Sequence, residues 1–184
     1  MKTLQMIRIV RVAALLGVTV SVVAACGETY PNLSSLAPVK LKFTAALTGA
    51  NEVPAVVTSA AGTMTLTKED SVTILYNIVT TAQTDSITMA HIHAGAAGVA
   101  GPVMVWFFPS TLSRAPGTGG GTAASVNGQV AIGRITRAGT SFVAPFTWDS
   151  LITRINAGTA YANVHTRKNG GGEIRGQVTA VATP

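Results

Sequence analysis

The residues best suited to chemistry are the three histidines of the 184-residue chain. His91 and His93 stand two apart in a strand-like segment, and residues at that spacing project from one face of a β-strand. Ile87 and Met89 precede them on the same face of a regular strand, so the pair would end an apolar stripe. His165 could complete a three-nitrogen site of the kind that binds zinc or copper and keeps one coordination position open. Histidines at this spacing also occur in buried hydrogen-bond networks, so a structural role stays open.

A second pattern places polar residues beside the third histidine. Two strand-like stretches flank the turn-forming sequence Arg-Lys-Asn-Gly-Gly-Gly at 167–172, which predicts a β-hairpin. A register symmetric about the asparagine of this turn puts His165 opposite Glu173 and Asn163 opposite Arg175. The carboxylate could hold the imidazole in one tautomer. Alternatively, Glu173 and Arg175 could form an internal polar cluster. A slip of one residue would separate these side chains.

The N-terminal segment has the layout of an export signal. Three basic residues precede an apolar run over 12–25. The sequence Val-Ala-Ala-Cys that ends at Cys26 resembles the bacterial lipobox, whose cysteine receives a diacylglyceryl group and becomes the first residue of the mature protein. The resemblance implies a lipoprotein signal peptide over 1–25 and membrane anchoring through a lipid on Cys26. An ordinary signal peptide is the alternative, and both place the protein at the cell envelope, outside the cytoplasm.

Composition and charge exclude several classes of protein. A hydrophobic content of 47% excludes disorder along the whole chain, and one cysteine excludes an internal disulfide framework and Cys-x-x-Cys redox chemistry. The net charge of +6 comes from 13 basic and 7 acidic residues, of which three basic residues belong to the export signal. The other arginines lack interleaved aromatic residues, so we expect no nucleic-acid partner. The sequence contains no Gly-x-Ser-x-Gly elbow, the motif that would indicate a hydrolase of that type.

Threonine- and valine-rich runs of period two predict many short antiparallel strands. The expected strands lie near 39–48, 62–67, 72–78, 86–93, 103–108, 126–135, 159–165 and 173–179, with a weaker candidate near Phe142. The run 103–108 is apolar on both faces, which predicts a central strand. A short helix is expected over 148–157, followed by a glycine. The pattern predicts an all-β fold, an antiparallel β-sandwich of the superoxide-dismutase or immunoglobulin-like kind with one short helix.

The expected domain organisation has three parts. The signal peptide at 1–25 is followed by a tether at 26–38, which is rich in turn formers, and by a folded domain at 39–184. Within the folded domain, the stretch 109–125 is too rich in Gly, Pro, Ser and Thr for a regular element, so we expect an exposed loop.

Four motifs in order resemble the CHRD domain, a module named after chordin and found in many bacterial secreted proteins. They are Leu-Thr-Gly-Ala-Asn-Glu-Val-Pro (47–54), Ala-His-Ile-His (90–93) with Gly-Pro-Val after it, Tyr-Ala-Asn-Val-His-Thr (161–166) and Gly-Glu-Ile-Arg-Gly-Gln (172–177). The resemblance implies an extracytoplasmic β-rich module. Ala55 stands where family members often have a second proline. The motif positions that carry over are Glu52, His91, His93, His165, Glu173 and Arg175.

The His-x-His strand with a distant histidine is also similar to copper–zinc superoxide dismutase. That enzyme holds copper with four histidines, and its zinc site adds an aspartate, whereas this chain has three histidines. Three hypotheses follow. The first is a lipid-anchored, noncatalytic module that binds copper or zinc through the histidines, or an unknown protein partner. The second is a mononuclear copper or zinc redox enzyme, and the third is a purely structural envelope domain.

Overall fold

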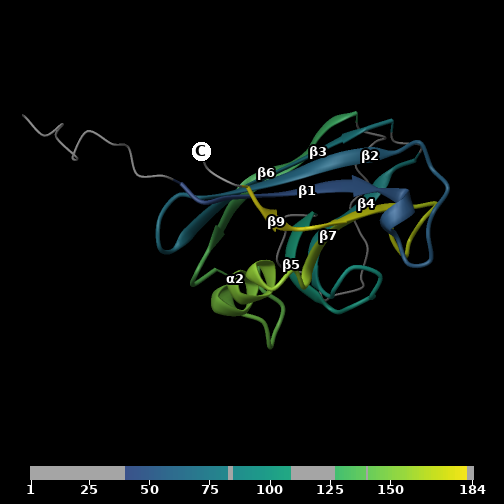
Figure 1. Ribbon diagram of the computed structural model, residues 1–184. Coiled ribbons are helices and arrows are strands. Elements are labelled where there is room, and N and C mark those ends of the chain that lie inside the picture. Colours follow the sequence, from purple (N-terminus) through teal and green to yellow (C-terminus); the bar gives the residue numbers. More distant parts are fainter. Residues whose placement is uncertain (1–39, 83–84, 109–126, 140, 182–184) are drawn as a thin grey trace, which may run out of the picture. The chain divides into compact units, whose positions relative to one another are not determined.

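The computed structural model describes the greater part of the predicted folded domain (Figure 1). The described residues are 40–82, 85–108, 127–139 and 141–181. The signal peptide, Cys26, the tether and the loop predicted at 109–125 lie outside the described residues. Among the residues that are described, no helix is long and apolar enough to cross a membrane.

Antiparallel strands form one sheet, in the order β5-β4-β7-β8-β1-β2-β3-β6, and β9 pairs with β1. The strands are β1 (Lys42–Thr48), β2 (Ala61–Lys68), β3 (Thr73–Thr81), β4 (Ile87–Ala94), β5 (Val103–Phe108), β6 (Gly128–Thr136), β7 (Ala160–Thr166), β8 (Ile174–Gln177) and β9 (Thr179–Ala180). Each predicted strand is present, although 173–179 divides into β8 and β9. The weaker candidate at Phe142 forms an isolated bridge to Val105.

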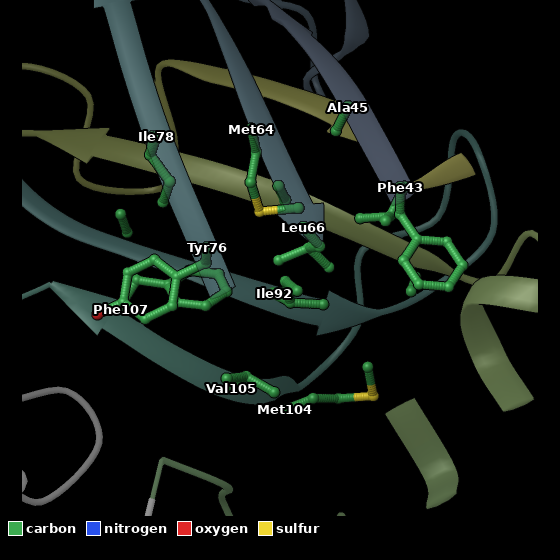
Figure 2. Close-up of a cluster of buried hydrophobic side chains, with 14 of the residues drawn as sticks. Phe43, Ala45, Met64, Leu66, Tyr76, Ile78, Ile92, Met104, Val105 and Phe107 are labelled. Carbon is green, nitrogen blue, oxygen red and sulfur yellow. The ribbon is translucent and has the colours of Figure 1, made fainter. Parts of the chain in front are cut away.

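The apolar core follows from the two-residue period of the strands. In β1, β2 and β3, alternate side chains are buried on one face, as Met64, Leu66 and Ile78 illustrate (Figure 2). The ring of Tyr76 on β3 lies 4.5 Å from that of Phe107 on β5, between centroids. Strands far apart in the sheet order therefore pack their side chains into one core, because the sheet curls on itself.

The sheet is nearly closed between its two end strands, β5 and β6. The chain after β6 covers the second edge of β5, where Trp106 N donates to Ser141 O (3.0 Å) and Val143 N donates to Met104 O (2.9 Å). The prediction that 103–108 is a central strand is therefore wrong. Its core-facing side chains are buried because the sheet closes, and its outer edge is protected by this covering segment. The all-β class with one short helix is confirmed, as a single nearly closed sheet.

The helix α2 (Trp148–Asn156) confirms the predicted helical segment. Thr147 and Ser150 form a reciprocal capping box at its N-terminus, which satisfies backbone groups that the first turn leaves free. A second, one-turn 3-10 helix, η2 (Gly49–Asn51), follows β1 and leads into the buried Glu52. These two elements connect the strands without adding a second sheet.

We predict that Phe107→Ala lowers the free energy of unfolding by about 3–5 kcal/mol, because it removes a fully buried ring that joins β5 to β3. Ile132→Ala is the matched control, since Ile132 is 64% exposed and its loss is expected within about 0.5 kcal/mol. Urea denaturation measures both. Equal losses in the two variants would contradict the packing described for the closed sheet.

Candidate metal centre

The histidines lie on the face of the sheet that points away from the apolar core. In β4, Ala90 and Ile92 belong to the core, so strand alternation directs His91 and His93 to the other face. In β7, Ala162 and Val164 belong to the core as well, so His165 is directed to the same face as His91 and His93. All three imidazoles are nevertheless buried. This part of the sheet is therefore covered on both faces.

An irregularity in the β4–β7 ladder decides which residues share the histidine face. The register shifts between Ile87 and Met89, after which Met89 pairs with His165 and His91 pairs with Asn163. Ile87 accordingly belongs to the core and does not continue the stripe that regular alternation predicts. Met89 is on the histidine face, as expected from the sequence.

The three rings form one cluster. Ring centroids are separated by 4.5 Å for His91 and His165, 4.7 Å for His91 and His93, and 6.1 Å for His93 and His165. One nitrogen from each ring lies within 4.8 Å of the others. The fold thus brings together the three histidines that the sequence nominated as a set of metal ligands.

Two backbone carbonyls orient two of the rings. His93 Nδ1 lies 2.8 Å from Gly101 O, and His165 Nδ1 lies 3.0 Å from Gly170 O. Because a carbonyl oxygen only accepts, each Nδ1 carries the proton and donates, and in a neutral ring the Nε2 atom then keeps its lone pair. This arrangement fixes the tautomer that a metal ligand needs.

Three imidazole nitrogens in the cluster have no hydrogen-bond partner. They are Nδ1 of His91, Nε2 of His93 and Nε2 of His165, and all are buried. A buried polar atom without a partner costs about 1–3 kcal/mol, so a cluster of three requires an explanation. A metal ion that accepts the lone pairs supplies one.

Burial keeps the three rings neutral. Desolvation lowers the pKa of His93 to about 4 and lowers the pKa of His165 below its ordinary value. Desolvation also lowers the pKa of His91 well below 6.5, and the two neighbouring histidines add to this effect. Neutral imidazole is the form that binds metals, so the cluster is ready to coordinate at neutral pH.

The predicted hairpin register is confirmed, because Asn163 pairs with Arg175 across β7 and β8. Asn163 Nδ2 donates to Glu52 Oε2 over 3.4 Å. Desolvation raises the pKa of Glu52 to about 7, although the charge of Arg175 opposes the shift. Glu52, Asn163 and Arg175 thus belong to one buried polar cluster, whereas the second interpretation of the hairpin paired Arg175 with Glu173.

The Glu173 carboxylate has a different partner from the one proposed for it. Its Oε1 atom accepts a hydrogen bond of 2.6 Å from the Thr58 hydroxyl. The carbonyl of Gly170 is the group that orients His165. Register alone placed Glu173 opposite His165, whereas the hydrogen bond of this ring's Nδ1 atom goes to the backbone of the turn.

Aromatic contacts that the sequence did not indicate surround the cluster. The ring of Tyr161 stacks on His93 at 4.8 Å with an interplanar angle of 1°. The guanidinium of Arg175 lies over the Tyr161 ring, 4.1 Å from its centroid. Trp106 meets His91 edge-on at 4.6 Å. Tyr161 belongs to the same strand motif as His165, and this shared motif is the one sequence signal that could have placed Tyr161 near the site.

A family model described as the CHRD domain matches residues 43–178. This chain belongs to the CHRD domain family. The resemblance drawn from the four motifs is thereby confirmed. No curated protein and no solved structure matches the chain. The six motif positions of this CHRD domain are all buried: Glu52, His91, His93, His165, Glu173 and Arg175.

We predict that the metal-free CHRD domain loses stability as the pH falls from about 6.5 toward about 4. In this window unfolded histidines bind protons that the buried rings do not. Each ring therefore contributes a slope of up to about 1.4 kcal/mol per pH unit. Glu52 opposes them, because between pH 4.5 and about 7 the folded carboxyl retains a proton that the unfolded one has lost.

Urea unfolding of chelator-treated protein between pH 7 and pH 5 measures this slope. His93→Asn should flatten it by removing one buried ring, and Glu52→Gln should steepen it by removing the opposing contribution. A wild-type stability that does not change with pH, and that neither variant alters, would contradict the burial of neutral rings.

Proposed function

We propose that this CHRD domain is a noncatalytic binding module that holds one copper or zinc ion through His91, His93 and His165. Two observations carry the proposal: one nitrogen from each ring lies within 4.8 Å of the others, and each ring has one buried nitrogen without a hydrogen-bond partner. Three imidazoles suit zinc and copper and leave a further position for another ligand.

The chain's own groups supply orientation and a dry environment. The carbonyls of Gly101 and Gly170 hold two rings with their Nε2 atoms free to coordinate. Nitrogens that bind one ion tetrahedrally at about 2.0–2.1 Å lie roughly 3.4 Å apart. Small rotations of the rings would therefore bring the three donors onto one ion.

A purely structural histidine network is the main alternative. Such a network satisfies its buried polar atoms through mutual hydrogen bonds. Here the rings contact one another, but one buried nitrogen of each ring forms no hydrogen bond. The ligand hypothesis accounts for these atoms, and the network hypothesis does not.

We further propose that the protein is anchored at the cell envelope, outside the cytoplasm, by a lipid on Cys26. The support is the basic and apolar segment before this residue and the Val-Ala-Ala-Cys sequence that closes it. An acylated cysteine would hold the domain at a membrane surface, since each buried methylene contributes about 0.8 kcal/mol.

For the metal, we predict about one copper or zinc ion per chain in protein purified without a histidine tag, measured by elemental analysis. The double variant His91→Ala/His93→Ala should lose the ion, because it removes two of three donors. Gln129→Ala is the control, since the Gln129 side chain is exposed on β6 and donates to Asn77 Oδ1, away from the histidines. Protein that stays metal-free after incubation with micromolar copper or zinc would exclude the site.

For the anchor, we predict that Cys26→Ser moves the protein from the membrane fraction to the soluble fraction in a bacterial host, because it removes the thiol that carries the lipid. Intact-mass measurement should show added acyl chains in the wild type and none in the variant. His165→Ala serves as the control and should stay with the membrane. A wild-type mass without acyl chains would overturn the anchoring proposal.

A further inference from the structure

The thioether of Met89 is a fourth metal-binding group on the strands that carry the three histidines. Met89 is the cross-strand partner of His165 and lies two residues before His91 on the same strand face. Side chains directly opposite in an antiparallel pair have Cβ atoms about 4.5–5.5 Å apart. Met89 is half-buried and is not part of the apolar core, and its pairing with His165 places it on the histidine face.

The register shift in β4 is what places this methionine. The irregularity between Ile87 and Met89 sends Ile87 into the core and leaves Met89 in the regular part of the ladder that contains His91 and His93. The sequence Met-Ala-His-Ile-His thus presents a thioether and two imidazoles on one face, and β7 adds the third imidazole.

The proposed ligands are all neutral, and one of them, the thioether, is a soft donor. Within the described parts of the chain, the cluster of ligand atoms contains three histidines and no carboxylate or thiolate. Imidazole suits both zinc and copper, whereas a thioether selects monovalent copper over the harder divalent ions. A thioether in the site would therefore favour copper, as Cu(I), over zinc.

The charge around the site favours the same ion. The Arg175 guanidinium stacks on Tyr161, which in turn stacks on His93, so a fixed positive charge lies one ring beyond the ligands. The cost of transferring an ion from water to a buried site grows with the square of its charge. A buried site whose ligands are all neutral disfavours a divalent ion more than a monovalent one.

We infer that Met89 completes a three-imidazole, one-thioether site that binds Cu(I) in preference to Zn(II). The inference rests on the proposed function, because it requires that the three histidines bind a metal. To the proposed function it adds the identity and oxidation state of the ion, and Met89 as a fourth ligand.

The test compares the metal affinities of the wild type and of Met89→Leu, which preserves side-chain volume and removes the sulfur. Cu(I) affinity is measured without oxygen by competition with bicinchoninate, and Zn(II) affinity by competition with a zinc-binding dye. Met89→Leu should weaken Cu(I) binding by at least about tenfold and leave Zn(II) binding within about twofold. Met64→Leu is the matched control, because Met64 lies in the apolar core.

X-ray absorption at the copper edge gives an independent readout. The wild type should show sulfur among the copper neighbours, and Met89→Leu should show nitrogen alone. Binding of Zn(II) as tight as that of Cu(I), or equal Cu(I) affinity in wild type and Met89→Leu, overturns this inference and leaves the three-histidine site intact. Failure to bind either ion overturns the proposed function as well.

Discussion

The arrangement depends on the burial of both faces of β4, β7 and β8. One face supplies the apolar core, and strand alternation sends every second residue to the other face. That second face carries the three histidines, Asn163 and Arg175, all of them buried. Segments that return over this face must therefore provide partners for polar side chains as well as exclude water.

The covering segments meet this requirement with backbone groups. Gly101 and Gly170 supply the carbonyls that orient His93 and His165. A side chain at Gly101 would collide with the Ala94 carbonyl, so glycine permits the close approach that brings its own oxygen to the ring. Gly172 has a φ of 131°, and a Cβ there would meet Glu52 and Asn163. The glycine content of the motifs thus serves the geometry of the site.

The same burial sets the electrostatics. Desolvation favours neutral imidazoles and raises the pKa of Glu52 to about 7. Arg175 keeps its position through stacking on Tyr161 and a 3.2 Å hydrogen bond to Val99 O. The cation that we propose for this site would be held by the lone pairs of the imidazoles.

Much of the fold follows from local patterns in the sequence. Period-two runs located the strands, and the symmetric turn at 167–172 predicted the pairing of Asn163 with Arg175 that the structure contains. Local patterns could not place β5, because its core contacts and the pairing of its outer edge with the segment 141–143 arise only when the sheet closes.

Only part of the site could be predicted, because local patterns do not show how distant segments meet. The spacing of His91 and His93 identified two ligands on one strand, and a separate motif supplied His165. The carbonyls of Gly101 and Gly170 could not be predicted, because any residue has a carbonyl and only the loop conformation decides where it points. The bulge that separates Ile87 from Met89 was also hidden, since nothing in the residues there marks a break in alternation.

The most direct test of the central claim is a crystal structure of the copper-loaded protein with data collected at the copper absorption edge. The account predicts one anomalous peak per chain, within bonding distance of His91 Nδ1, His93 Nε2 and His165 Nε2. A peak elsewhere, or no peak and direct hydrogen bonds between these three nitrogens, would contradict it.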